Sequence, residues 1–169
     1  SNRTRNNGGG LYMSDDTLIA TNTTFNHNAS MASNAAAGGV WLGGNNTSYT
    51  FDRCRIQYNT AGQSGGGVNI ESNVNAVFTN TLITDNELTL SNGTRYGGGI
   101  YDNSSANNNR TFTNVTIANN TADYGGGYYR ASGVSSQFIN CIVFYNTAIS
   151  QESFNNVGGS VTYSDIEGG

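Results

Sequence analysis

The amino-acid sequence predicts an all-β fold, a right-handed parallel β-helix (a solenoid) of five to six turns with three short strands per turn. Two linked motifs recur five times in the same order, short runs alternate between apolar and polar residues, and no stretch has the spacing of an amphipathic helix. The repeats are 26 to 34 residues long, enough for one turn in which each strand lies parallel to its counterpart one turn earlier. The handedness follows from the usual preference of parallel crossovers. Residues 1–169 are therefore expected to form one domain.

The first motif is a glycine pair followed by an apolar or aromatic residue. The second glycines of successive pairs are 29, 28, 32 and 28 residues apart. The five copies are Gly9–Leu11, Gly38–Val40, Gly66–Val68, Gly98–Ile100 and Gly126–Tyr128. Each glycine pair is expected to form a bend, and the residue after it is expected to begin a strand and to point inward.

The second motif places an apolar residue three positions before an asparagine. The five asparagines are 31, 27, 34 and 26 residues apart, and they are Asn28, Asn59, Asn86, Asn120 and Asn146. In stacked turns they fall in one column at a bend, where side-chain amides can hydrogen-bond one another and the backbone of the bend. We therefore expect a structural asparagine ladder. A second column is expected at Asn22, Asn80, Asn114 and Asn140, interrupted by Arg53.

The same alignment predicts the core and two unpaired cysteines. The expected core residues are Leu11, Val40, Val68, Ile100, Phe51, Phe78, Phe112, Phe138, Phe25, Ile56, Ile83, Ile117 and Val143. Cys54 and Cys141 fall in an inward column with Thr23, Thr81 and Val115. They lie three turns apart, about 14 Å, which exceeds the roughly 7 Å between Cα atoms that a disulfide tolerates. Two buried free thiols are the expectation.

Composition excludes several classes of function. Only 36% of the residues are hydrophobic and 11% are charged, but ten tyrosines, seven phenylalanines and the lack of proline argue against a disordered chain. All seven basic residues are arginine and the net charge is -4, so no basic surface for nucleic acid or anionic lipid is expected. No apolar run approaches the roughly 20 residues of a membrane span.

One column of outward residues is the candidate binding surface. It contains the second residue after each glycine pair, namely Tyr12, Trp41, Asn69, Tyr101 and Tyr129. Exposed aromatic rings stacked along a sheet would form a flat platform for sugar rings or for a partner protein, because a π face offers a large contact area at little entropic cost. The alternative interpretation is that aromatic residues simply suit strands and shield the backbone.

The two motifs appear most fully in Gly38–Val40 and in Phe25–Asn28. In combination they resemble the repeats of the polymorphic outer membrane proteins, which are bacterial autotransporter adhesins. The closing residues 163–169 are similar to a late-turn sequence of β-helical surface proteins in the pectate-lyase-like superfamily that carry C-terminal sorting or anchor domains. The resemblance implies the fold and a secreted or bacterial cell-surface location, and it says little about activity.

The predicted function is an extracellular or cell-surface structural or adhesive module that contacts glycan or another protein through the aromatic column. Neither end carries the polar cap that solenoids normally need, so the chain is expected to be an excerpt of a longer protein, with further turns or other copies at both ends. No metal and no other cofactor is expected, and the sequence offers no support for a calcium site.

An enzyme on the same fold is the first alternative. A polysaccharide lyase or glycoside hydrolase would need clustered carboxylates, and the candidates are Asp15, Asp16 and Glu71. Asp15 lies two turns from Glu71, and the roughly 10 Å of axial rise fits a paired-carboxylate site loosely. Asp102 is expected inside the solenoid, in a structural ion pair with Arg130 one turn later.

An ice-binding solenoid is the second alternative. Such a protein would present a flat array of threonines, and Thr21 and Thr79 share an outward column. Asp52 and Ile139 interrupt that column, which argues against this function.

Overall fold

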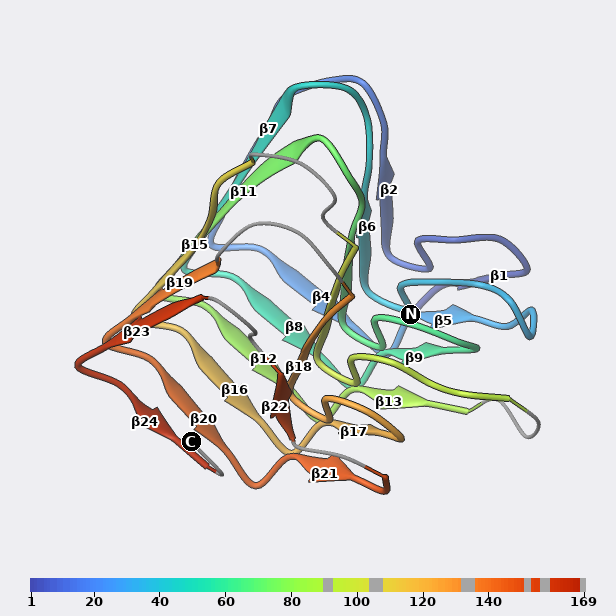
Figure 1. Ribbon diagram of the computed structural model, residues 1–169. Helices are drawn as coiled ribbons and strands as arrows, with labels where there is room; N and C mark the ends of the chain where they lie inside the picture. Colours follow the sequence, from blue (N-terminus) through green and yellow to red (C-terminus); the bar gives the residue numbers. More distant parts are fainter. Residues whose placement is uncertain (90–92, 104–107, 132–135, 151–152, 156–158, 168–169) are drawn as a thin grey trace.

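The computed structural model describes residues 1–89, 93–103, 108–131, 136–150, 153–155 and 159–167. Within these ranges the chain forms 24 strands and no helix, arranged as four parallel sheets of six strands (Figure 1). Each strand pairs with its counterparts in the neighbouring turns, so the chain completes five turns between the first and the sixth strand of a sheet. The predicted all-β parallel solenoid is confirmed.

The four sheets, A to D, follow one another along each turn. Sheet A contains β1 (Arg3–Thr4), β5 (Ala29–Ser30), β9 (Thr60–Ala61), β13 (Glu87–Leu88), β17 (Thr121–Ala122) and β21 (Thr147–Ala148). Sheet B contains β2 (Leu11–Met13), β6 (Val40–Leu42), β10 (Val68–Ile70), β14 (Ile100–Asp102), β18 (Tyr128–Arg130) and β22 (Phe154–Asn155). Sheet C contains β3 (Leu18–Thr21), β7 (Thr47–Asp52), β11 (Val74–Thr79), β15 (Arg110–Thr113), β19 (Ser136–Ile139) and β23 (Ser160–Thr162). Sheet D contains β4 (Thr24–Asn26), β8 (Arg55–Gln57), β12 (Leu82–Thr84), β16 (Thr116–Ala118), β20 (Ile142–Phe144) and β24 (Asp165–Ile166).

The expectation of three strands per turn is wrong, because each turn contains four. Sheets B, C and D surround the main core, and sheet A lies at the corner between D and B (Figure 1). Sheet A has a small apolar cluster of its own, made of Ala61, Leu88 and Ala122. Its strands are only two residues long, too short to show an alternation of apolar and polar residues, and for this reason the sequence pattern does not reveal them.

The chain turns three of its corners with one residue in the left-handed backbone conformation. Between sheets C and D these residues are Asn22, Arg53, Asn80, Asn114, Asn140 and Tyr163, with φ of 50–55°. Between sheets D and A they are His27, Tyr58, Asp85, Asn119 and Tyr145, with φ of 52–57°. Between sheets A and B they are Gly8, Ala37, Gly65, Gly97 and Gly125, with φ of 58–71°. Asparagine and glycine adopt this conformation at the least cost, which explains their abundance at the corners between sheets C and D and between sheets A and B.

Both predicted asparagine columns form. In the inner ladder each backbone N–H and each side-chain amide donates to the Oδ1 of the asparagine in the next turn, at 2.9–3.0 Å, from Asn28 through to Asn146. All five of these side chains are buried. The outer column is exposed: Asn114 donates to Asn80, Asn140 donates to Asn114, and Arg53 donates to Asn22 where the column is interrupted.

The inner ladder explains why the glycine and asparagine motifs always occur together. The second glycine of each pair passes directly over the amide of a ladder asparagine. A Cβ atom at these five glycines would lie 2.7–3.0 Å from the amide nitrogen. At Gly39 it would also lie 2.5 Å from the carbonyl oxygen of Gly67. Only glycine fits this approach, so each motif requires the other.

The predicted core is largely confirmed. Phe51, Phe78, Phe112 and Phe138 stack through four turns with ring centroids 4.6–5.3 Å apart, and the aliphatic columns beside them are fully buried. Leu11 and Phe25, in the first turn, are half-buried and pack against this core. Cys54 and Cys141 are buried and unpaired as predicted, and burial raises the pKa of both thiols.

Candidate functional site

The candidate surface lies on the outer face of sheet B. The middle residues of its three-residue strands are in register and form the predicted column of Tyr12, Trp41, Asn69, Tyr101 and Tyr129. Asn155 of β22 continues the column in the sixth turn. The aromatic members are half-buried, except for Tyr12, which is 54% exposed. The column is therefore a partly accessible surface with packed side chains.

Tyr12 and Trp41 form a stacked pair. Their ring centroids are 4.3 Å apart and their planes differ by 2°, so each ring covers one face of the other. The indole extends along its own strand to Gly43, where a Cβ atom would lie 2.2 Å from the ring. The Nε1 atom of Trp41 is buried and has no hydrogen-bond partner within the described ranges. This half of the column is packed against itself rather than open as a flat platform.

Asn69 separates this pair from the tyrosines that follow. The structure confirms its place in the column, but the expected exposure is wrong because its side chain is fully buried. Its Oδ1 accepts a hydrogen bond of 3.1 Å from Ser64, and its amide donates one of 2.8 Å to Glu71. Asn103 donates to the other carboxylate oxygen of Glu71 at 2.9 Å. Two neighbouring amides thus already occupy both oxygens of Glu71.

A second column runs beside the first and contains two more tyrosines. Ala36, Ser64, Tyr96 and Tyr124, on the connections from sheet A to sheet B, are joined by parallel bridges. Each lies five residues before a member of the first column. Tyr96 packs against Tyr101, Tyr124 and Tyr129 at centroid distances of 6.2, 5.4 and 4.8 Å. We refer to Tyr96, Tyr101, Tyr124 and Tyr129 as the tyrosine cluster. Tyr96 and Tyr124 lie outside the predicted column, although their spacing to Tyr101 and Tyr129 could have revealed them.

An ion pair holds the two connections that carry Tyr96 and Tyr124. Arg95 donates from Nη2 to Asp123 at 2.6 Å and from Nε at 3.2 Å, and its backbone N–H donates at 3.1 Å. Its Nη1 donates to the carbonyl of Leu88 at 2.7 Å. These hydrogen bonds lower the pKa of Asp123 below its ordinary value and fix one tyrosine ring over the next.

Two hydroxyl groups of the tyrosine cluster, those of Tyr101 and Tyr129, hold their protons more firmly than an ordinary tyrosine does. Desolvation raises the pKa of Tyr101, with a smaller effect of the Glu71 charge, and desolvation also raises the pKa of Tyr129. In the part of the chain that the structure describes, none of the four hydroxyls has a hydrogen-bond partner. They can therefore donate to a ligand or accept from one.

Tyr12 also borders a pocket of about 710 Å³ at the first turn. The other lining residues are Thr4, Arg5, Asn6, Asn7, Gly8, Asn34 and Ala35. Asn7 is held in place because its Oδ1 accepts the backbone N–H of Ala36 at 2.8 Å. One aromatic ring among amide and hydroxyl groups is a surface that can bind a polar ligand.

The carboxylates considered for catalysis do not form a cluster. Asp15 and Asp16 are exposed and bond to neighbouring groups: Asp15 accepts from Ser14 and from the backbone of Asn45, and Asp16 accepts from the backbone of Thr17. Glu71 lies two turns away with both oxygens engaged. The described residues contain no group of three His, Cys, Asp or Glu side chains that could hold a metal ion. The arrangement offers no paired acid and base.

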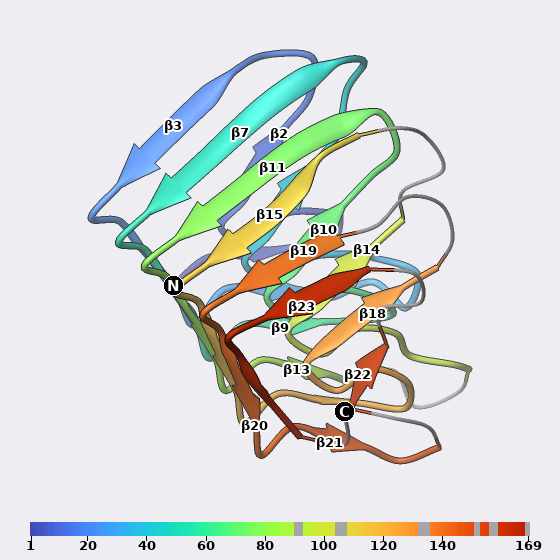
Figure 2. The same cartoon turned by 60° about the vertical axis from the view of Figure 1, so that its left-hand side comes forward.

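The outer face of sheet C carries the threonine column considered for ice binding. Its strands lie side by side across the molecule (Figure 2). The register places Thr21, Asp52, Thr79, Thr113, Ile139 and Thr162 in one column. Asp52 forms a 2.8 Å ion pair with Arg53, so the predicted interruption of the threonine array is real and carries charge.

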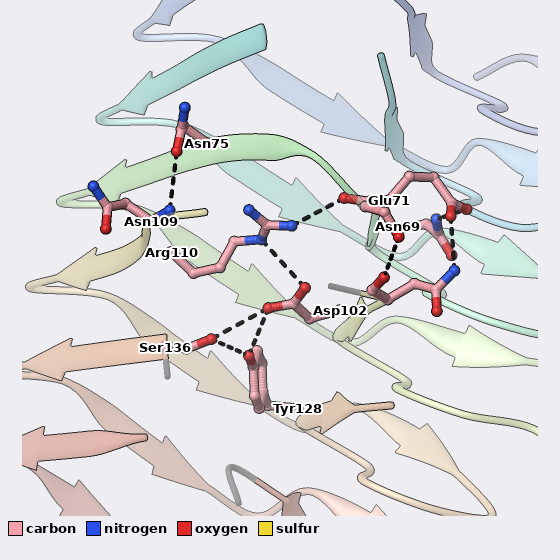
Figure 3. Close-up of polar contacts among 10 residues, drawn as sticks. Asn69, Glu71, Asn75, Asp102, Asn109, Arg110, Tyr128 and Ser136 are labelled. Carbon is pink, nitrogen blue, oxygen red and sulfur yellow. Dashed lines mark hydrogen bonds and ion pairs between the residues drawn. The ribbon is translucent and has the colours of Figure 1, made fainter. Parts of the chain in front are cut away.

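Asp102 lies inside the solenoid as predicted, but its partner in the described ion pairs is different. Its Oδ1 is 3.2 Å from the Nε of Arg110, on the next strand of the same turn (Figure 3). Its Oδ2 accepts from the hydroxyls of Tyr128 and Ser136 at 2.9 and 3.2 Å. Arg130, the expected partner, is the register neighbour of Asp102 in the next turn. The strand register alone does not predict this ion pair, because the side chain of Arg110 in sheet C reaches Asp102 in sheet B across the corner between the two sheets.

Comparisons with known proteins give one informative match. No protein-family model and no solved structure matches the chain. The probable outer membrane protein pmp20 of Chlamydia pneumoniae is 33% identical over 127 residues, which covers 64% of this chain and 7% of that protein. The chain thus spans a small part of this relative, and at a coarse level the match is consistent with a secreted or cell-surface location. No helix in the described ranges is long and apolar enough to cross a membrane. The likeness to the pectate-lyase-like superfamily stays a prediction.

Proposed function

We propose that this chain is a stretch of a bacterial cell-surface β-helix that acts as a stiff adhesive module, and that its tyrosine cluster binds glycan. The likeness to part of an outer membrane protein supports the surface location. The fold supports stiffness, because every strand is hydrogen-bonded to a neighbouring turn and the inner asparagine ladder is buried throughout.

The observation that carries the proposal is the tyrosine cluster itself. Four half-buried tyrosine rings gather at one place on a chain in which only 36% of residues are hydrophobic. Half-exposed aromatic surface with free hydroxyl groups is suited to partners that offer both C–H groups and hydroxyls. Sugar rings have this chemistry. The Tyr12–Trp41 pair gives weaker support for glycan binding, because these two rings already cover each other.

Electrostatics favour a neutral glycan over an acidic one. Arg95, the arginine beside the cluster, donates three hydrogen bonds to Asp123 and one to Leu88, so its guanidinium is already engaged. Desolvation raises the pKa of Tyr101, and the negative charge of the nearby Glu71 carboxylate raises it further. A sugar carboxylate would therefore meet the negative charge of Glu71, while the guanidinium of Arg95 is already committed to other partners.

A glycan array probed with the native chain and with three tyrosine variants tests the proposal. Tyr101→Ala and Tyr129→Ala should lose the neutral-glycan signal, because each removes a ring that packs against Tyr96 in the cluster. Tyr163→Ala is the matched control: Tyr163 is 88% exposed at a corner outside the cluster, and its removal should leave binding unchanged. Absence of any glycan signal from the native chain, or equal signals from all variants, would contradict the proposal.

The enzyme alternative can be tested on the same glycans. Release of new reducing ends that survives Trp41→Ala but disappears in Glu71→Ala would favour catalysis over adhesion. We expect no release, since Asp15, Asp16 and Glu71 are not paired.

A further inference from the structure

We propose that the pocket beside Tyr12 is a second binding site, which takes a sugar unit with a carboxylate and holds that carboxylate through the guanidinium of Arg5. The pocket lies at the first two turns, whereas the tyrosine cluster lies at the fourth and fifth turns. The inference does not depend on glycan binding by the tyrosine cluster. It rests on a hollow of about 710 Å³, on a cation at its wall that no described residue pairs with, and on an exposed aromatic ring.

Small residues leave room for this pocket beside the outer face of sheet B. In the fourth and fifth turns the adjoining column contains Tyr96 and Tyr124, whose rings belong to the tyrosine cluster. The corresponding residues of the first and second turns are Asn7 and Ala36, and Oδ1 of Asn7 accepts the backbone N–H of Ala36 at 2.8 Å. An amide and a methyl group occupy much less space than two phenol rings. The outer face is therefore hollowed beside Tyr12.

The walls of the pocket are the connections from sheet A to sheet B in the first and second turns. These two connections lie side by side (Figure 1). Hydrogen bonds join them at both ends: the N–H of Met31 donates to the carbonyl of Thr4 at 2.8 Å, and the N–H of Gly8 donates to the carbonyl of Ala36 at 3.0 Å. The walls are thus formed before a ligand arrives, which lowers the entropic cost of binding.

Arg5 supplies the one charge among the described residues that line the pocket. Its exposed side chain forms no hydrogen bond or ion pair within the described ranges. Arg53, Arg95 and Arg110 differ, because each of them is paired with an aspartate. A guanidinium group presents a planar fork of N–H donors, and both oxygens of a carboxylate can accept from one such fork. The pocket therefore favours a ligand with a carboxylate.

The other groups on the wall indicate that the carboxylate belongs to a sugar. Trp41 stacks on one face of the Tyr12 ring, yet Tyr12 is 54% exposed, so aromatic surface remains for the C–H groups of a sugar ring. The amide nitrogen of Asn7 and the whole amide of Asn34 have no hydrogen-bond partner in the part of the chain that the structure describes. These amides can bond to sugar hydroxyls, which both donate and accept.

Titration calorimetry of the native chain with matched glycans tests the inference. The acidic probes are 3′-sialyllactose and a trimer of galacturonic acid, and their neutral counterparts are lactose and the methyl ester of the trimer. At least one acidic probe should bind about tenfold more tightly than its counterpart, because hydrogen bonds to a charged group are strong. The probe that binds identifies which kind of sugar carries the carboxylate. Equal affinities within both pairs would overturn the inference.

Variants assign the preference for acidic glycans to one arginine. Arg5→Gln should abolish this preference, and Arg5→Lys should retain part of it, because lysine keeps the charge and lacks the planar fork. Arg55→Gln is the matched control, since Arg55 is an exposed arginine of β8 in sheet D and does not line the pocket. Tyr101→Ala should also leave the preference intact, so this inference and the proposed function fail separately. A preference that persists in Arg5→Gln would overturn the inference.

Two further ligands test the chemistry of the site on the native chain, whatever the variants do. Acetate has the carboxylate but no ring to cover Tyr12, so it should compete with the bound glycan only at a much higher concentration. Competition by acetate at the concentration of the glycan itself would overturn the assignment of a sugar. Lactose 3′-sulfate carries a tetrahedral anion in place of the planar carboxylate. Tighter binding of lactose 3′-sulfate than of both acidic probes would overturn the assignment of a carboxylate.

Discussion

The inner asparagine ladder makes a large and specific contribution to stability, which Asn86→Ala should reveal. Asn86 lies at the centre of the ladder and is fully buried. Its amide donates to the carbonyl of Ile56 and to Oδ1 of Asn120, both at 2.9 Å. Its Oδ1 accepts from the backbone N–H and the amide of Asn59, both at 3.0 Å. The alanine variant loses all four hydrogen bonds and keeps the backbone unchanged.

The expected loss follows from the groups that are left without partners. The backbone N–H of Asn59 loses its acceptor, and the carbonyl of Ile56 loses the amide that bonds to it. The amide of Asn59 keeps its hydrogen bond to the carbonyl of Phe25. Oδ1 of Asn120 still accepts from the backbone N–H of residue 86. The backbone N–H of Asn59, left without a partner, costs ~1–3 kcal/mol, and the three other lost hydrogen bonds cost roughly 0.5–1.5 kcal/mol each, which together give a loss of about 4 kcal/mol in the free energy of unfolding. For a chain of this length the Tm should fall by about 8–16 °C.

Asn114→Ala is the matched control from the outer column. Asn114 also bonds to asparagines of both neighbouring turns, but it is exposed, so water can replace these bonds. Its φ of 55° adds strain for alanine, and the total loss should stay near ~1 kcal/mol. Urea unfolding followed by circular dichroism provides both values. If the two variants lost equal stability, burial would not be the reason that the inner ladder stabilises the fold.

Two further predictions concern the Arg95–Asp123 pair and the thiols. Because Arg95 lowers the pKa of Asp123 below 3.8, the pair should stabilise the fold fully above about pH 4 and lose this effect as the pH falls through the lowered pKa. Asp123→Asn should therefore have a lower Tm than the native chain at pH 7 and an equal Tm near pH 2; a difference that is independent of pH would refute this account. Cys54 and Cys141 should not react with a thiol reagent at pH 7 until the chain unfolds, because both are buried and burial raises their pKa values. Rapid labelling of the folded chain in a timed absorbance assay would contradict their placement.

Much of the fold follows from the repeat, for a physical reason. In a parallel solenoid, equivalent residues of successive repeats must lie over one another, so aligning the chain with itself is enough to predict the register. Both asparagine columns, the phenylalanine stack, and the separation of Cys54 from Cys141 were predictable in this way. The glycine motif was predictable too, although its close approach to the ladder amide appears only in the structure.

The three-dimensional path of the chain decides which side chains are neighbours within a turn. Tyr96 meets Tyr101 because the connection from sheet A brings its ring beside sheet B, and Arg110 reaches Asp102 across the next corner. The burial of Asn69 depends on such lateral neighbours, since Ser64 comes from the adjoining connection.

The sequence by itself determined the stacking of the turns, because the repeat imposes one axial period on every equivalent residue. The tertiary structure alone decided the fourth strand of each turn, the ring contacts within the tyrosine cluster and the partner of Asp102. The fourth strand depends on corners at which one residue with positive φ redirects the chain, and no periodic pattern in the sequence records the resulting angle. The partner of Asp102 depends on the corner between sheets B and C, which the side chain of Arg110 crosses.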